Sequence, residues 1–297
     1  VGYPGQSAVV PKRLVGANIS RAVGLLRPTD GLLPPYLACY LNSPAGRKEF
    51  LRPSAGSAQI VVNLGALNKL AMPVPAPAEQ AAIATALSAV DALLAGCDAI
   101  VHLGGVSVER PFEDILEANI KGIFNVYEAE RRHGVKRVVF ASSNHVIGFY
   151  KQSETLDASV LRRPDGYYGL SKSFGEDMAQ FYFDRYGIET VSIRIGSSFP
   201  EPLNRRMMST WLSYDDLTQL IEKSLFTPNV KHTVVYGASA NQSVWWDNHA
   251  AAHLGYVPKD NSEVFRTKVE AQPPMAANDP NAIYQGGAFT AQGPFGD

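Results

Sequence analysis

Past Gly96 the chain alternates between short apolar runs and amphipathic stretches, a rhythm that few folds accommodate. Apolar runs with the length of buried strands cover Ala99 to Leu103, Arg137 to Ala141, Thr190 to Ile195 and Thr233 to Tyr236. Between them, apolar residues spaced three and four apart predict helices over Phe112 to Arg132, which Gly134 ends, Tyr168 to Tyr186 and Asp215 to Leu225. Such alternation predicts an α/β fold, with a parallel sheet covered by helices on its faces. The Pro-, Gly- and Asn-rich stretch from 271 onward reads as a loosely ordered tail.

The first third of the chain has a different pattern. It is broken by Gly and Pro, and its short apolar runs at Ala8 to Val10, Gly24 to Leu26 and Ile60 to Leu64 predict strands, with one helix near 34–52. Three prolines between Met72 and Gln80 impose an extended segment, and a helix follows directly. We therefore expect a mixed α+β module over 1–95, followed by a second part over 96–297.

Charge also separates the two parts. Residues 1–96 hold 8 Lys and Arg against 4 Asp and Glu, a net +4, and residues 97–297 hold 19 against 24, a net −5, which together give the −1 of the whole chain. This asymmetry permits a polyanionic partner for the first part only, although an ordinary solvated surface is the preferred interpretation of a charge spread so thinly.

Few signals for other classes of protein are present. The chain has no apolar run long enough to span a membrane and no basic, then apolar, leader, so the cytoplasm is the default location. Cys39 and Cys97 are the only cysteines and form no C-x-x-C pair, which argues against a disulfide scaffold or a thiolate zinc site. The first residue is Val1 rather than Met, which indicates a fragment or a trimmed chain.

Ser143, Tyr168 and Lys172 have the types and spacing of a proton-relay site for oxidising or reducing a carbon–oxygen bond. On a helix, Lys172 is four residues beyond Tyr168 and shares its face, so we expect the ammonium to lower the pKa of the phenol and make it a usable general base. Ser143 follows the apolar run at 137–141, at the strand end where open α/β sheets bind ligands, and its hydroxyl can orient the reacting oxygen.

Longer motifs around these residues carry a resemblance. GCDAIVHLGGVSVERPFEDILEANIKG, FASSNHVIGFY, RRPDGYYGLSKSFGED, RIGSSFPEP and GASANQSVWWDN resemble the extended short-chain dehydrogenases of the NAD-dependent epimerase/dehydratase family and, among them, the uronate dehydrogenases. The resemblance covers residues 96–297. It implies NAD as cofactor and oxidation of a hexuronic acid at C1 to the aldarolactone, with Ser143, Tyr168 and Lys172 catalytic.

The same resemblance implies further site residues. The substrate positions fall on Ser107, Asn144, His145, Ser197 and Arg206, with Arg206 offering a guanidinium fork to the substrate carboxylate. The cofactor positions fall on Leu103, Gly104, Gly105, Ala141, Ser142, Tyr168, Lys172, Ile195 and Gly196. Arg206 as a surface arginine and His145 as a satisfied histidine at a strand end are the alternatives. His249 and His253 have the spacing of a metal pair but lack a third ligand, so no metal is expected.

One part of the family pattern is missing before Ala99. Complete members open with a strand and a G-x-x-G-x-x-G turn whose backbone N–H groups hold the cofactor pyrophosphate. The nearest match, Gly2-x-x-Gly5-x-x-Ala8, meets Pro11 where a helix should run, and we interpret it as chance. We expect an incomplete Rossmann-like sheet with exposed edges and weak cofactor binding, so the activity of this chain alone is doubtful.

Residues 1–95 carry a second resemblance through NISRAVGLLRP, LACYLNSPAGRKEF and SAGSAQIVVNLGALNKLAMPVPAPAEQAAIATALSAVDALL. These resemble the target-recognition domain of type I restriction specificity subunits, which implies DNA as a partner and a methyltransferase subunit bound through the helix at 79–95. The candidate DNA contacts are Lys12, Arg13, Arg21, Arg47 and Lys48. The leading hypothesis is thus an oxidoreductase-derived chain fused to a DNA-recognition fragment. The alternatives are a DNA-binding specificity fragment with an inert dehydrogenase part, or a misassembled product with neither activity.

Overall fold

The computed structural model describes residues 7–10, 25–29, 31–51, 71–84 and 96–293. The chain divides into two compact units, Val1–Leu93 and Leu94–Asp297.

The first unit has two helices where the sequence predicts one over 34–52. Helix α1 spans Pro34–Asn42 and helix α2 spans Pro44–Leu51. The break falls at Ser43, which is extended (ψ 159°) and whose hydroxyl accepts a hydrogen bond from the backbone N–H of Gly46 at 3.1 Å. Ser43 thereby caps the second helix, and the proline that follows it occupies the first helical position, which suits both residue types.

A helix over 77–84 begins at the last of the three prolines, close to the start that the sequence predicts. Its Gln80 is fully buried; the side-chain amide donates to the carbonyls of Gly31 and Pro75 at 2.7 Å each and accepts from the N–H of Leu33 at 2.8 Å. The described stretches of this unit contain no strand, so the strand predictions at 8–10 and around Leu25 are wrong, and the one at 60–64 lies outside the described residues.

The second unit contains the parallel sheet that the alternating pattern predicts. Its strands are β1 (Ala99–His102), β2 (Arg137–Ser143), β3 (Glu189–Ile195) and β4 (His232–Gly237), in the spatial order β1-β2-β3-β4 with every neighbouring pair parallel. Because all four strands run the same way, their carboxyl ends meet at one edge of the sheet. The α/β class and the Rossmann-like arrangement are therefore confirmed for this part of the chain.

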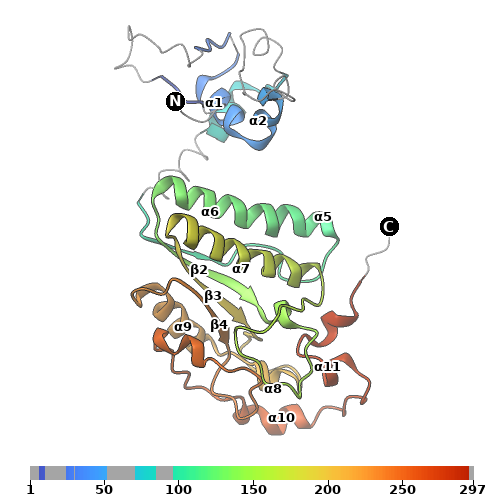
Figure 1. The fold of residues 1–297 in the computed structure, drawn as a ribbon. Coiled ribbons are helices and arrows are strands. Elements are labelled where there is room, and N and C mark those ends of the chain that lie inside the picture. Colours follow the sequence, from blue (N-terminus) through green and yellow to red (C-terminus); the bar gives the residue numbers. More distant parts are fainter. Residues whose placement is uncertain (1–6, 11–24, 30, 52–70, 85–95, 294–297) are drawn as a thin grey trace. The chain divides into compact units, whose positions relative to one another are not determined.

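Helices cover both faces of this sheet (Figure 1). One continuous helical stretch comprises α5 (Phe112–Ile115), a π-helical turn (Leu116–Lys121) and α6 (Gly122–His133). It ends at Gly134, whose φ of +77° is the left-handed cap that glycine adopts most readily. Helix α7 spans Tyr167–Tyr186 beside it, and α9 (Tyr214–Phe226) lies on the opposite face.

The apolar core follows the two-residue alternation of the strands. Val138 and Phe140 of β2 pack with Ile123 and Tyr127 of α6 and with residues of α7, whereas Val139 between them packs on the other face. That second cluster contains Val139, Val191, Ile193, Leu220, Val230, Val235, Ala251 and Leu254. Successive side chains of a strand point to opposite faces, so one buried strand supplies both layers of the core.

A buried ion pair joins α7 to β3. Arg194 is 1% exposed and its Nε and Nη2 donate to the two carboxylate oxygens of Glu176 at 2.9 and 2.8 Å. Glu176 also accepts from the hydroxyl of Ser142 at 2.7 Å and from Nε of Arg162 at 3.2 Å, and Arg194 donates to the hydroxyl of Tyr236 at 3.1 Å. The pair fixes the helix that carries Tyr168 against the middle of the sheet.

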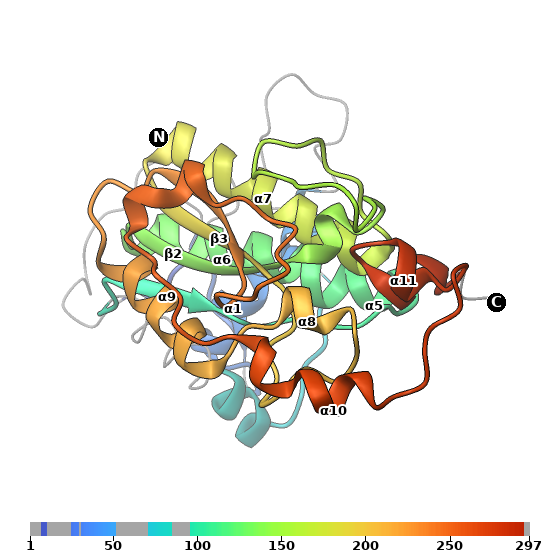
Figure 2. The ribbon, with the colours of Figure 1, turned by 90° about the horizontal axis from the view of Figure 1, so that it is seen from below.

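The C-terminal segment is not the loose tail that the sequence predicts. After α10 (Arg266–Glu270), short helical elements within the predicted tail cover Pro280–Ile283 (α11) and Gly287–Ala291, and Figures 1 and 2 both place α11 toward the carboxyl ends of the strands. Between them Gln285 is fully buried, and its backbone N–H donates to the carbonyl of Tyr150 at 2.8 Å. Composition misled the prediction because long-range contacts, and not local periodicity, order this stretch.

The remaining short helical elements are Asn144–Ile147, Met207–Thr210 (α8), His249–Leu254 and Ser262–Phe265. Among the helices that the structure describes, none has the length and apolar character to cross a membrane.

Candidate active site

A cavity of about 660 Å³ lies in the second unit, where the strands end. The loop after β1, the ends of β2 and β3, the start of α7, the segment leading into α8 and the C-terminal segment all line it. Its lining includes Leu103, Gly105, Ser107, Ala141, Ser142, Ser143, Asn144, His145, Tyr168, Lys172, Ile195, Gly196, Ser197 and Arg206. Of the dehydrogenase-type residues that the sequence singles out, Gly104 alone does not line the cavity.

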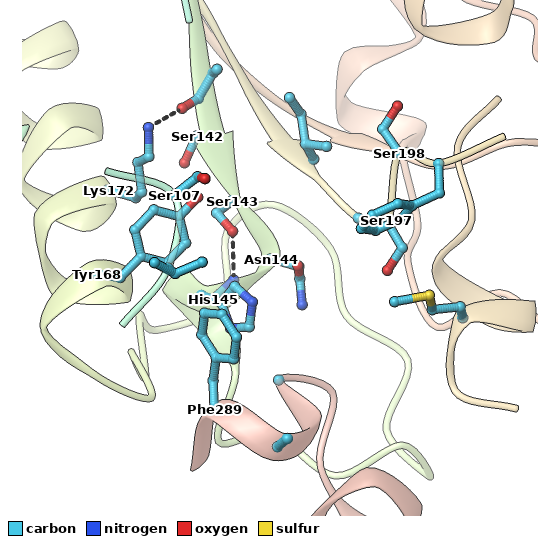
Figure 3. Close-up of a pocket in the computed structure, with 18 of the residues that line it drawn as sticks. Ser107, Ser142, Ser143, Asn144, His145, Tyr168, Lys172, Ser197, Ser198 and Phe289 are labelled. Carbon is cyan, nitrogen blue, oxygen red and sulfur yellow. Dashed lines mark hydrogen bonds between the residues drawn. The ribbon is translucent and has the colours of Figure 1, made fainter. Parts of the chain in front are cut away.

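The three catalytic candidates meet on one side of this cavity (Figure 3). Ser143 is the last residue of β2, and its hydroxyl accepts from the backbone N–H of His145 at 3.2 Å. Tyr168 and Lys172 lie one turn apart on α7, and the Lys172 ammonium is 5.7 Å from the centre of the Tyr168 ring. The ammonium donates to the carbonyl of Ala141 at 2.7 Å, so the strand end holds it in place.

The electrostatics of Tyr168 differ from the expectation. Burial raises the pKa of the Tyr168 phenol; a hydrogen bond with Ser143 partly offsets this, and the charge of Asp165 adds to the rise. Burial also lowers the pKa of Lys172 to about 8, so the amine is charged at neutral pH and loses its proton just above it. The net shift of the Tyr168 pKa is thus upward, opposite to the predicted lowering, because burial is the largest contribution.

The loop after β1 is fastened by one side chain. Asn119, in the π-helical turn, accepts from the N–H of Val106 at 2.8 Å and donates to its carbonyl at 3.0 Å, and it donates to Ser171 of α7 at 2.9 Å. Gly105 has a φ of +127°, and a Cβ there would lie 2.7 Å from the Asn119 side-chain oxygen. Glycine is thus required at 105, and the loop that presents Ser107 to the cavity is tied to the helix of Tyr168.

Glu109 connects the same loop to the start of α7. Its two carboxylate oxygens accept from the backbone N–H groups of Tyr167 and Tyr168 at 2.7 and 2.9 Å. A carboxylate at a helix N-terminus satisfies donors that have no partner within the helix and interacts favourably with the helix dipole. Glu109 was not among the predicted site residues, although it lies in the motif VSVERP, which belongs to the first of the sequences quoted above.

Four of the cofactor candidates lie where β2 and β3 reach the cavity. Ala141 and Ser142 are among the last three residues of β2, Ile195 is the last residue of β3, and Gly196 follows it. A Cβ on Gly196 would lie 2.1 Å from the carbonyl of Thr210, so the chain can follow this path only with glycine there. These small residues, the apolar Leu103 and the polar groups of Tyr168 and Lys172 suit a flat ring carrying polar substituents, as a nicotinamide is. The segment Gly2-x-x-Gly5-x-x-Ala8 lies largely outside the described residues.

Arg206 is buried, so its interpretation as a surface arginine is wrong. It is 8% exposed, and its Nε and Nη2 donate to the backbone carbonyl of Gln285 at 2.8 and 2.5 Å. Burial lowers the pKa of Arg206 to about 10, an effect that the charge of Asp165 opposes, so the guanidinium stays charged at neutral pH. Asn144 donates to the same carbonyl at 3.3 Å. Sequence reasoning missed Gln285, because nothing local marks it.

His145 is held on three sides. Its Nδ1 lies 2.7 Å from Oδ2 of Asp165, its ring stacks on Phe289 with centroids 3.9 Å apart, and Tyr168 meets it edge-on at 5.6 Å. Figure 3 shows His145, Phe289 and Tyr168 grouped at one end of the cavity. Asp165 and Phe289 were both missed by sequence analysis, although Asp165 lies in the quoted motif RRPDGYYG.

The other candidates lie as follows. Ser107 lines the cavity from the β1 loop, and Ser197 follows β3 with its hydroxyl 2.9 Å from that of Thr210. No group of His, Cys, Asp and Glu in the described residues could hold a metal ion, and Nε2 of His253 lies 3.1 Å from the hydroxyl of Thr233. Of the DNA candidates, Lys12, Arg13 and Arg21 lie outside the described residues, Arg47 is half-buried and Lys48 is exposed.

Comparison with known proteins shows which family has this sequence and fold. The NAD dependent epimerase/dehydratase family matches residues 62–214. A uronate dehydrogenase of Pseudomonas syringae pv. tomato is 74% identical over 209 residues, which are 70% of this chain and 76% of that protein.

Solved structures agree. The glucuronic acid dehydrogenase of Chromohalobacter salexigens aligns with a TM-score of 0.67 at 55% identity, over 69% of this chain and 78% of that chain. A mutant of the Agrobacterium tumefaciens uronate dehydrogenase complexed with NAD aligns with a TM-score of 0.68 at 54% identity, over 71% and 80% of the two chains.

The interpretation of residues 1–95 as a restriction-type recognition module gains no support. The family match begins at residue 62, inside the segment assigned to that module. Neither the described residues nor these comparisons support DNA or a methyltransferase subunit as a partner, and the interpretation stays a prediction.

Proposed function

Since this chain belongs to the NAD-dependent epimerase/dehydratase family, we propose that its second unit carries an oxidoreductase site that oxidises a uronic acid with NAD. More specifically, we propose that the site oxidises a hexuronic acid at C1, which yields the aldarolactone. The uronate dehydrogenase and the glucuronic acid dehydrogenase compared above are each more than half identical to this chain over the aligned residues, and this supports the substrate class.

The proposed chemistry divides between the cofactor and three side chains. When bound, NAD supplies the acceptor for the hydride that leaves C1. Tyr168 accepts the proton of the C1 hydroxyl, and Ser143, within hydrogen-bonding reach of the phenol, orients the oxygen that loses it. Loss of one hydride and one proton leaves a carbonyl at C1, which in a cyclic sugar is the lactone.

Lys172 has two tasks in this proposal. Its ammonium lies 5.7 Å from the phenol ring, so it stabilises the negative charge that forms on Tyr168. It also donates to the carbonyl of Ala141, at the strand end where the cofactor ring would lie. Because burial raises the phenol pKa, this stabilisation is needed: an uncompensated phenolate in the cavity would be strongly disfavoured.

We propose that Arg206 binds the substrate carboxylate. Two of its N–H groups are held by the carbonyl of Gln285, which leaves the other guanidinium N–H groups for the cavity that Arg206 lines. Ser107, Asn144, His145 and Ser197 line the same cavity and offer short polar groups to the sugar hydroxyls. A buried guanidinium gains more from an anionic ligand than an exposed one, since little water competes.

The observation that carries the proposal is the convergence of these residues on one cavity from segments up to roughly 100 residues apart in the chain. The test is formation of NADH by the full chain with glucuronate or galacturonate, with glucose and galactose as neutral controls. We expect turnover of the uronates only. Tyr168→Phe should lower kcat by about 100-fold or more, since it removes the proton acceptor. Arg206→Met should raise KM for the uronates, and the neutral sugars should remain unoxidised by this variant as by the wild type.

Cofactor affinity is measured separately, by calorimetry of NAD with the full chain. Because no glycine-rich pyrophosphate turn precedes Ala99 in the sequence, we expect binding weaker than is usual for a dehydrogenase. Binding in the ordinary range would show that the turn is dispensable or replaced. An absence of NADH formation with every uronate at saturating NAD would refute the proposed function.

A further inference from the structure

A buried carboxylate stands behind the polar end of the cavity. The side chain of Asp165, which precedes α7 by two residues, is 0% exposed. Its Oδ2 lies 2.7 Å from Nδ1 of His145, and its Oδ1 is buried without a hydrogen-bond partner. A buried carboxylate with one oxygen unpaired is costly, so the arrangement calls for an explanation.

The backbone makes room for this carboxylate at three glycines. A Cβ on Gly148 or on Gly286 would lie 1.9 Å from Oδ2 of Asp165, and a Cβ on Gly169 would lie 3.0 Å from Oδ1. The glycines belong to the segment after β2, to the C-terminal segment and to α7. Three separate parts of the chain therefore close around Asp165, and the carboxylate has a fixed position.

The hydrogen bond to Asp165 decides where the His145 proton lies. An ionised carboxylate only accepts hydrogen bonds, so Nδ1 must be the donor, and in the neutral ring Nε2 is then an acceptor. The ring cannot rotate freely, because Phe289 stacks on one face and Tyr168 meets it edge-on. No hydrogen bond to Nε2 is found among the described residues, and His145 lines the cavity.

We propose that Asp165 is a positioning residue that keeps the His145 proton on Nδ1 and so presents Nε2 as a hydrogen-bond acceptor to a hydroxyl of the sugar substrate. This inference rests on the proposed function and adds a specificity element to it. An acceptor at this place selects a substrate that carries a hydroxyl there, since an analogue without one leaves Nε2 desolvated and unpaired.

The contacts of Asp165 differ from those of a purely structural carboxylate. Asp165 meets the ring of His145 through Oδ2 and leaves Oδ1 without a hydrogen bond. A purely structural carboxylate, such as Asp216 in α9, instead accepts from backbone N–H groups, here those of Lys259 and Asp260 at 2.8 and 3.0 Å.

The proton position is tested by nitrogen NMR of the histidine rings in the full chain without ligand, with the His145 signals identified by their loss in His145→Gln. In the wild type we expect a protonated Nδ1 and an unprotonated Nε2. Asp165→Asn offers a donor toward Nδ1, and Asp165→Leu offers neither donor nor acceptor. We expect the proton to move to Nε2 in at least one of them. A proton that stays on Nδ1 in both variants would overturn the assignment.

A double-mutant cycle tests the link to substrate. Asp165→Asn should raise KM for the uronate about tenfold, the worth of one hydrogen bond, with a smaller change in kcat. In a His145→Gln background the same substitution should change KM less than about twofold, because the imidazole that Asp165 orients is no longer present. Asp216→Asn is the matched control, and it should lower stability without changing KM.

Failure of this inference differs from failure of the proposed function. If the fold-changes in KM of Asp165→Asn and His145→Gln multiply in the double variant, Asp165 does not act through His145. The inference is then refuted, but the proposed oxidoreductase function is not. If the wild type oxidises no uronate, the proposed function is refuted, and so is the proposal that Nε2 of His145 accepts from a sugar hydroxyl. The NMR result then still decides whether Asp165 places the proton.

Discussion

The buried pair between Glu176 and Arg194 gives a sharp test of how the second unit is held together. We consider Arg194→Met, which replaces the guanidinium by an apolar chain of similar length. The carboxylate of Glu176 is then left in the core, with one hydroxyl from Ser142 and the half-exposed Arg162 as its remaining partners. Both charges of the native pair are almost fully shielded from water, at 1% and 0% exposure of the side chains.

The size of the effect follows from this burial. Removal of one partner of a buried ion pair typically costs about 3–5 kcal/mol, because the remaining charge keeps its desolvation penalty without compensation. Removal of both charges in Glu176→Met with Arg194→Met also removes that penalty. It leaves the Ser142 hydroxyl without its partner, at about 1 kcal/mol, whereas the Tyr236 hydroxyl still donates to the carbonyl of Asp157 and Arg162 still pairs with Asp177. The double variant should therefore be more stable than the single one.

Urea unfolding followed by tryptophan fluorescence measures this directly. The three tryptophans of the chain, Trp211, Trp245 and Trp246, all belong to the second unit, so the signal reports that unit alone. Arg266→Met is the control, since Arg266 makes solvent-accessible pairs with Glu263 and Glu270 and its loss should change stability much less than that of Arg194. The reasoning is refuted if Arg194→Met costs no more than the control, or if the double variant is less stable than Arg194→Met alone.

Three further predictions concern stability. Burial raises the pKa of the fully buried Glu130 to about 8. The free energy of unfolding should therefore fall by about 1.4 kcal/mol per pH unit as the pH rises from 5 to 8, and Glu130→Gln should abolish that slope in urea midpoints. Gly166→Ala places a Cβ 2.4 Å from the Glu109 carboxylate and should cost about 1–2 kcal/mol by displacing the α7 cap; an unchanged midpoint would contradict this. Burial lowers the Lys172 pKa to about 8, so the wild type should gain stability as pH rises from 8 to 10, and Lys172→Met should lose that gain along with activity.

The sheet and the long helices were predictable because their signals are local. Periodicity placed α7 and α9 within one residue at each end, and Gly134 marked the end of α6 through the left-handed conformation that it adopts. The C-terminal segment was mispredicted because the side chain and backbone of Gln285 bond to partners up to 141 residues away. No window of sequence around residue 285 contains those partners.

The candidate site divides in the same way. Ser143, Tyr168 and Lys172 were found because a helix turn and a strand end fix their relation. The shift in the Tyr168 pKa had the wrong sign, since spacing reveals the nearby cation but not the extent of burial, which decides the balance here. Arg206 was predicted to bind substrate, with a surface position as the alternative, and its local sequence could not reveal the hydrogen bond to the backbone of Gln285 that holds it. Asp165 carried no periodic signal, and its role emerges only from the glycines around it.

The attachment of Arg206 to Gln285 has a consequence for biogenesis. The carbonyl that holds this guanidinium comes from a residue 79 positions later in the chain. A ribosome makes that residue after the four strands and α7, which can fold before it. We therefore expect recognition of the acidic sugar to be acquired after the scaffold has folded, so that a nascent polypeptide halted before residue 285 has its redox residues assembled but no competent anion clamp.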